Sequence, residues 1–180
     1  RLRPDKAIEK YQFISNNDES LKRIAFQLDS IDDLTIDGNG THLLFTGFIS
    51  PFNLENCTNI TIENLSIDFT RTFHSEGTIS NVFDGGIDIM FPEDYRVDIQ
   101  NGLLRFRDSE GTVYPYGNML EFDVAKREPA HYAHDIWLWG SGVQASKNDD
   151  GSYRLLGSDK TGTVGNIMIF GALARYNPAF

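Results

Sequence analysis

Apolar and polar side chains alternate along the segment TNITIENLSIDF, residues 58–69. Its apolar positions are Ile60, Ile62, Leu65, Ile67 and Phe69. One slip in the alternation, at Asn64, predicts a bend. A period of two residues is typical of a β-strand with one buried face, so we expect this segment to form a strand.

An earlier segment repeats the same pattern. The hexamer DLTIDG (33–38) aligns with NITIEN (59–64), 26 residues later, in the order polar, apolar, Thr, Ile, acidic. A repeat of about 20 to 30 residues made of short strands and polar turns indicates a stacked β-solenoid, in which each coil buries its apolar face on the next. We therefore predict that Ile36 stacks near Ile62, and that Asn, Thr and Ser at equivalent positions form hydrogen-bonded ladders.

After Glu76 the pattern changes to short strands separated by glycine-containing turns. Three segments have the form of a β-hairpin, namely residues 77–91, 103–117 and 142–157. In the third, an Asp-Gly pair at 150–151 supplies the turn. Turns about every 10 to 15 residues favour an antiparallel sandwich or a small barrel.

The predicted fold is therefore all-β, with parallel β-helix coils interrupted by an inserted antiparallel β-barrel or sandwich. We expect coils over residues 1–76, the insert over 77–164, and a return to the coil stack over 165–180. The return should place Asn166–Phe170 in parallel beside the 59–69 strand. Asp18–Phe26 is the clearest candidate for a helix.

The formal net charge of −10 argues against two classes of partner. A nucleic acid selects for clustered Lys and Arg, and an anionic membrane surface does the same. A neutral sugar is compatible with the charge, although solubility alone also explains it. No stretch approaches the roughly 20 apolar residues of a membrane span, so membrane insertion is not expected.

The chain opens with RLRPDKAIEKYQF, without Met and without a visible signal peptide, so we expect the true N-terminus to lie before Arg1. The single cysteine, Cys57, excludes an internal disulfide. Because it lies in an apolar alternation, we interpret it as a buried structural thiol.

Four stretches together resemble glycoside hydrolase family 110, a family of bacterial exo-acting α-galactosidases that remove terminal α-1,3-linked galactose. The stretches are FISNNDESLKRIAFQL, LTIDGNGTHLLFTGFISPF, CTNITIENLSIDF and RTFHSEGTI. The resemblance implies a right-handed parallel β-helix with a small β-barrel inserted early. It also implies an inverting enzyme that uses no cofactor, is periplasmic or secreted, and acts on glycans or polysaccharides with terminal galactose.

In this family the catalytic aspartates lie in later coils, which the resemblance places beyond Phe180, so no catalytic residue is carried over onto the chain. We therefore expect the chain to be the N-terminal portion of a longer enzyme. The paired acids Asp149–Asp150 and Asp32–Asp33 are interpreted as turn residues instead.

Asp68, Arg71, His74 and Glu76 cluster where the coil leaves for the insert, and they are the candidate substrate-binding residues. Inverting hydrolysis needs two carboxyl groups about 6.5 to 9.5 Å apart. An arginine keeps a nearby carboxylate ionised, and a histidine can donate to a sugar hydroxyl. The alternative is a surface ion cluster that fastens the insert to the coil.

A pair of histidines and a pair of tryptophans each allow a functional and a structural interpretation. His131 and His134 have a spacing that could hold a metal, but Pro129 and the aromatic run favour a loop entering a strand, and no metal is predicted. Trp137 and Trp139 fall on one face of a strand, where they either stack on sugar rings or fill a core.

Three functions remain open on the sequence, since a fold alone does not choose between them. The first is the galactosidase described above. The second is a non-catalytic carbohydrate-binding or scaffold fragment. The third is a polysaccharide lyase, although these often use Ca²⁺ and the chain has no Asp-rich calcium pattern.

Overall fold

The computed structural model describes residues 1–13, 19–93, 95–131, 133, 136–137, 143–157 and 162–172. The described chain is all-β, and its helical element is the short 3-10 turn η1 (Pro4–Lys6). It forms two compact units, one made by Arg1–Phe73 and the other beginning at His74.

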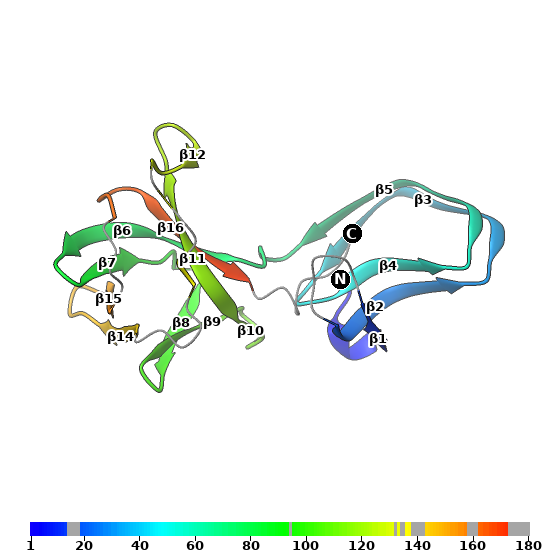
Figure 1. The fold of residues 1–180 in the computed structure, drawn as a ribbon. Helices are drawn as coiled ribbons and strands as arrows, with labels where there is room; N and C mark the ends of the chain where they lie inside the picture. The colour runs from blue at the N-terminus through cyan, green and yellow to red at the C-terminus, as the bar shows by residue number, and fades with distance from the viewer. Residues whose placement is uncertain are drawn as a thin grey trace. The chain divides into compact units, whose positions relative to one another are not determined.

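The first unit contains two parallel strand pairs (Figure 1). Its strands are β1 (Ile8–Gln12), β2 (Ser20–Asp29), β3 (Asp32–Phe45), β4 (Ser50–Glu55) and β5 (Thr58–Phe69). In the pair β3–β5, Ile36 lies beside Ile62, and in the pair β2–β4, Ile24 lies beside Ser50. The offset of 26 residues that the repeat predicts is present throughout β2–β4 and over Asp32–Asp37 of β3, and the register shifts between Asp37 and Thr41. The stacking of Ile36 on Ile62 is confirmed.

Side chains at equivalent positions of the paired strands contact one another, although the pairs Phe26–Phe52 and Gln27–Asn53 are not the predicted ladders of Asn, Thr and Ser. The rings of Phe26 and Phe52 stack with centroids 5.0 Å apart, and the Nδ2 of Asn53 donates to the Oε1 of Gln27 at 2.8 Å. Such contacts between equivalent positions fix the register, because a slip of one residue would turn every side chain to the other face.

Two sequence-based expectations in this unit are wrong. Instead of a helix over Asp18–Phe26, the structure has strand β2 from Ser20 onward, in which Lys22 and Ile24 are buried and Arg23 is exposed. This alternation satisfies a sheet pairing that helix propensity does not offer. Asp32 and Asp33 do not form a separate turn but begin β3, with Asp33 in the left-handed region at φ 56°.

The second unit is antiparallel throughout its described pairs. Its strands are β6 (Ser75–Phe83), β7 (Gly86–Met90), β8 (Arg96–Gln100), β9 (Leu103–Arg107), β10 (Val113–Tyr114), β11 (Tyr116–Asp123), β12 (Glu128–Pro129), β13 (Ile136–Trp137), β14 (Gln144–Lys147), β15 (Tyr153–Leu156) and β16 (Ile167–Ala172). The three predicted hairpins are present as β6–β7, β9–β10 and β14–β15.

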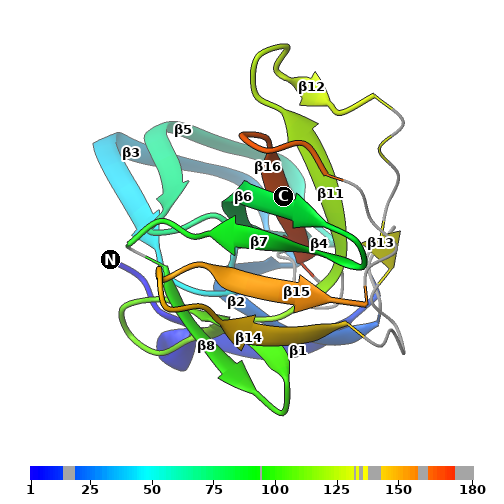
Figure 2. The ribbon, with the colours of Figure 1, turned by 90° about the vertical axis from the view of Figure 1, so that its left-hand side faces the viewer.

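The main sheet of this unit has the order β12-β11-β16-β6-β7-β15-β14, with β13 paired to β11, and Figure 2 shows β6, β7, β15 and β14 side by side. A smaller sheet has the order β10-β9-β8. Neither sheet closes on itself over the described strands, so the structure has an antiparallel unit without a closed barrel.

The predicted return to the coil stack at residue 165 is wrong for the described residues. Strand β16 lies between β11 and β6 and pairs antiparallel with both, with Phe170 opposite Ser75 and Met119. Met168 and Phe170 are buried there, at 0% and 1% exposure. Residues 167–170 form a continuous apolar run, which is typical of a buried parallel strand but can also lie inside an antiparallel sheet, so the sequence pattern did not identify the neighbours of β16. Residues 173–180 lie outside the described part.

Candidate functional site

The four predicted substrate-binding residues are divided between the two units. Asp68 lies near the end of β5 in the first unit, exposed, and its Oδ1 accepts the backbone N–H of Phe69 at 2.7 Å. Arg71, half-buried, follows β5 in the same unit. His74 opens the second unit, and Glu76 lies in β6 opposite Ile169 of β16. The boundary between units therefore falls inside the predicted set.

Other residues singled out from the sequence are placed as follows. His131 is exposed in a turn, whereas His134, Trp139 and the side chain of Trp137 lie outside the described residues. Cys57 is half-buried rather than buried, and its Sγ lies 3.1 Å from the carbonyl oxygen of Glu55.

Within the described residues, no group of three or more His, Cys, Asp or Glu is placed to hold a metal ion. In the same part of the chain, no helix is long and apolar enough to cross a membrane.

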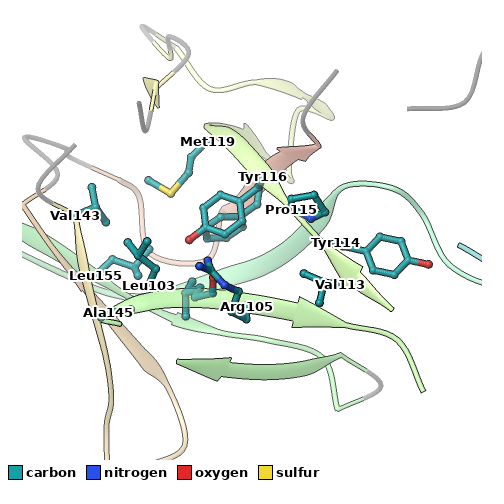
Figure 3. A pocket seen from close by; sticks show the side chains of 13 residues that line it. Leu103, Arg105, Val113, Tyr114, Pro115, Tyr116, Met119, Val143, Ala145 and Leu155 are labelled. Carbon is teal, nitrogen blue, oxygen red and sulfur yellow. The ribbon is translucent and has the colours of Figure 1, made fainter. Parts of the chain in front are cut away.

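A pocket of about 270 Å³ opens in the second unit between β9, β10, β11 and β14 (Figure 3). Its apolar wall is formed by residues that include Leu103, Val113, Met119, Val143 and Leu155. Its polar side chains are Arg105 and the two tyrosines Tyr114 and Tyr116. Pockets with apolar walls and a few polar groups are the usual sites of small ligands.

Tyr116 is positioned in this pocket by contacts with neighbouring aromatic rings. Its ring lies 5.4 Å from that of Phe106 and 5.3 Å from that of Phe170, both edge-to-face. Burial raises the pKa of the Tyr116 hydroxyl, so the group is a neutral donor at physiological pH. The Nη1 of Arg105 donates to the backbone oxygen of Leu104 at 3.1 Å. The polar groups that the pocket presents to a ligand are therefore a neutral hydroxyl and a cationic guanidinium.

No Asp or Glu is among the described residues that line this pocket. Inverting hydrolysis of a glycoside needs a carboxylic acid and a carboxylate base on opposite sides of the sugar. The pocket thus has the features of a binding site, and its described lining residues do not include the pair that cleavage requires.

Among the described residues of the second unit, Asp88 and Asp108 are the buried aspartates, and both have structural contacts. Asp108, 6% exposed, accepts the backbone N–H groups of Glu110 at 2.8 Å and of Thr112 at 2.9 Å. These bonds form the turn that joins β9 to β10.

Asp88, 5% exposed, forms a two-bond ion pair with Arg154, with distances of 2.8 and 3.0 Å from Nε and Nη2. The hydrogen bond from Arg154 lowers the pKa of Asp88 to about 2, although burial opposes the shift. A general acid needs the opposite shift, so Asp88 is excluded from that role.

Sequence reasoning missed Asp88, Arg154, Arg105 and Tyr116. Asp88 and Arg154 are 66 residues apart and meet only because β7 pairs with β15. One local signal was readable: Asn101 and Gly102, at φ 53° and 73°, form the turn between β8 and β9, and Asn-Gly is the preferred pair for such a hairpin.

Comparison with known proteins gives a family match and several relatives. The family model described as GLAA-B beta-barrel domain I matches residues 75–168. The chain is 31% identical over 179 residues to alpha-1,3-galactosidase A of Shewanella woodyi, which covers 97% of this chain and 29% of that protein.

Two further relatives are the alpha-1,3-galactosidase A of Bacteroides fragilis and the alpha-1,3-galactosidase B of Bacteroides thetaiotaomicron. The first is 35% identical over 126 residues (67% of this chain, 21% of the relative), and the second is 34% identical over 119 residues (65% and 19%). The chain spans less than a third of the length of these relatives. It belongs to the α-1,3-galactosidase A and B family, glycoside hydrolase family 110.

Proposed function

We propose that this chain is the N-terminal part of an inverting exo-α-galactosidase that removes terminal α-1,3-linked galactose from glycans. The observation that carries the proposal is the 31% identity to an alpha-1,3-galactosidase A along nearly the whole chain. The function is periplasmic or extracellular in this proposal, because glycans with terminal galactose are found outside the cytoplasm.

The first unit is proposed to supply the opening coils of a right-handed parallel β-helix. The offset of 26 residues that β2–β4 shares with the first half of β3–β5 supports this role, since stacked coils repeat at a similar length. The second unit is proposed to be the small barrel domain inserted into that helix, which the family model supports.

The catalytic acid and base are proposed to lie outside these 180 residues. The pocket of the second unit is lined by no described carboxylate, and Asp88, a buried carboxylate, has a lowered pKa. In this proposal Asp68, Arg71, His74 and Glu76 border the sugar or support residues that do.

The test uses the full-length protein that carries this chain. Incubation with a galactose-α-1,3-galactose disaccharide should release galactose, and the α-1,4-linked isomer should be cleaved far more slowly. Proton NMR in the first minutes should show the β-anomer of galactose, as expected for inversion. Release of the α-anomer first would contradict inversion, and no release from either isomer would contradict the activity.

A second candidate is a non-catalytic carbohydrate-binding or scaffold role. The pocket around Arg105 and Tyr116 favours it, because the described lining residues include donors for binding and no carboxylate for cleavage. Binding of the disaccharide by the full-length protein without release of galactose would support this candidate over the first.

A further inference from the structure

Two arginines, Arg96 and Arg107, share one face of the hairpin formed by β8 and β9. Arg96 lies directly opposite Arg107, and Asp98 lies directly opposite Arg105. Opposed residues and alternate residues point to the same side of an antiparallel pair. The other side carries Leu104 and Phe106, both 0% exposed, so the arginine face is the outer one.

This arrangement is unfavourable for folding. Like charges directly opposite each other in a sheet are destabilising. Asp98 offsets one of the charges, since its Oδ2 lies 3.2 Å from the Nε of Arg107. Arg96 is exposed and has no ion-pair partner in the part of the chain that the structure describes. The chain has 26 acidic and 16 basic residues, so a positive cluster does not follow from its composition.

A groove adjoins this face, and we name it the arginine groove. Its lining includes Arg96, Arg107, Lys147, Tyr95 and Tyr153, and its volume is about 600 Å³. The Nζ of Lys147 lies 5.4 Å from the centroid of the Tyr153 ring. Its described acids are Glu93 and Asp98, and Asp98 is already paired with Arg107. Arg96 and Lys147 therefore remain as cations available to a ligand.

We propose that the arginine groove binds an anionic saccharide, meaning a sugar chain that carries carboxylate or sulfate groups. A guanidinium donates two parallel hydrogen bonds to such a group, and an ammonium adds a point charge. The half-buried Tyr95 beside Arg96 offers an apolar ring to a sugar, whereas Tyr153 is buried and its hydroxyl donates to the backbone oxygen of Val97 at 2.8 Å. The retained repulsion between Arg96 and Arg107 is then explained, because a bound anion relieves it.

The choice of a saccharide rests on the proposed function in galactose-containing glycans. In this proposal the groove binds the ligand without cleaving it, since among its described lining residues Glu93 is the one acid outside the Asp98–Arg107 pair and hydrolysis needs two carboxyl groups.

The experiment measures binding by calorimetry with the full-length protein in low salt. The probes are a sulfated galacto-oligosaccharide, an oligogalacturonate, a neutral galacto-oligosaccharide of equal length, and inorganic sulfate. We expect at least one anionic oligosaccharide to bind about tenfold more tightly than the neutral one, with an affinity that falls as salt is raised. The stronger of the two anionic probes identifies the group that the site prefers.

The variant Arg96→Gln combined with Lys147→Gln should lose about tenfold in affinity for the anionic probe. Lys126→Gln, an exposed lysine of the same unit outside the groove, is the matched control and should bind as the wild type does. Arg96→Gln alone should melt at the wild-type temperature or above it, because it removes the repulsion with Arg107.

Equal affinity for neutral and anionic oligosaccharides, or an unaffected double variant, would overturn the proposal. If inorganic sulfate bound as tightly as the anionic oligosaccharide, the site would be a simple anion site and the assignment of a saccharide ligand would be wrong. Galactose release from the neutral disaccharide is measured on the same samples and should be unchanged in all variants. If the wild type released no galactose, the proposed enzymatic function would be contradicted. The binding data would still test the proposal for the arginine groove.

Discussion

Asn59 lies beside Asp33 in the parallel pair β3–β5, and both residues adopt the left-handed backbone conformation, with φ of 55° and 56°. The side-chain Nδ2 of Asn59 donates to the Oδ1 of Asp33 at 2.6 Å. Asn and Asp tolerate this conformation better than other residues with a Cβ. The two stacked positions therefore combine a backbone requirement with a hydrogen bond between strands.

Replacing Asn59 separates these two contributions. Asn59→Gly keeps the backbone conformation and loses the hydrogen bond, so it should destabilise β5 by about 1 kcal/mol. Asn59→Ala also meets the left-handed penalty and should cost about 1 to 2 kcal/mol more. Hydrogen exchange of the β5 amides measures both variants, and equal exchange in the two would show that the backbone conformation carries no cost.

The ion pair of Asp88 with Arg154 should make stability depend on pH. The folded pKa of Asp88, about 2, lies below its unfolded value, so the pair stabilises the fold above about pH 4 and this contribution is lost as the pH falls toward 2. Asp88→Asn should lower the free energy of unfolding by about 2 kcal/mol at pH 7, with the difference shrinking in acid.

The chain's two tryptophans, Trp137 and Trp139, both belong to the sequence of the second unit, so their fluorescence during urea unfolding reports on it. Asp84→Asn, in the exposed turn between β6 and β7, is the control and should unfold like the wild type. A deficit in Asp88→Asn that stays constant down to pH 2 would contradict the role of the carboxylate charge.

Arg71 and His74 are expected to differ when tested in the full-length enzyme. Arg71→Ala should lower stability by about 1 to 2 kcal/mol and leave galactose release nearly unchanged, as for a residue that fastens structure. His74→Ala should keep the melting temperature and cut kcat/KM about tenfold, because an imidazole N–H can donate to a sugar hydroxyl. Unaltered kinetics in His74→Ala would remove this residue from the substrate site.

Gly86 is needed where β7 passes close to β15. A Cβ at this position would overlap the backbone oxygen of Leu155, so the two strands would have to separate. Gly86→Ala should destabilise the second unit by about 1 to 3 kcal/mol, the range for overpacking. Gly85→Asn is the neighbouring control: its side chain meets open space and asparagine accepts the φ of 82°, so its melting temperature should change little.

Local pattern was sufficient for some elements and insufficient for others. The 26-residue repeat and the Asp-Gly hairpin of β14–β15 depend on residues near one another in the chain, and both are present. The strands that pair with β16 are set by contacts with distant parts of the chain, and the sequence of Ile167–Ala172 does not specify them. The opposition of Arg96 and Arg107 likewise follows from the turn at Asn101–Gly102, which sets the register of the hairpin.

Strand β16 is the last described strand in the chain but lies between β11 and β6 in the main sheet. During synthesis on the ribosome, β6 and β11 therefore leave the exit tunnel before β16. Each of them has an unpaired edge until residues 167–172 have also left the tunnel. Unpaired edges of this kind recruit other chains. Assembly of the sheet is consequently a late and non-local event, and slow elongation before residue 167 would prolong the interval in which nascent chains can aggregate.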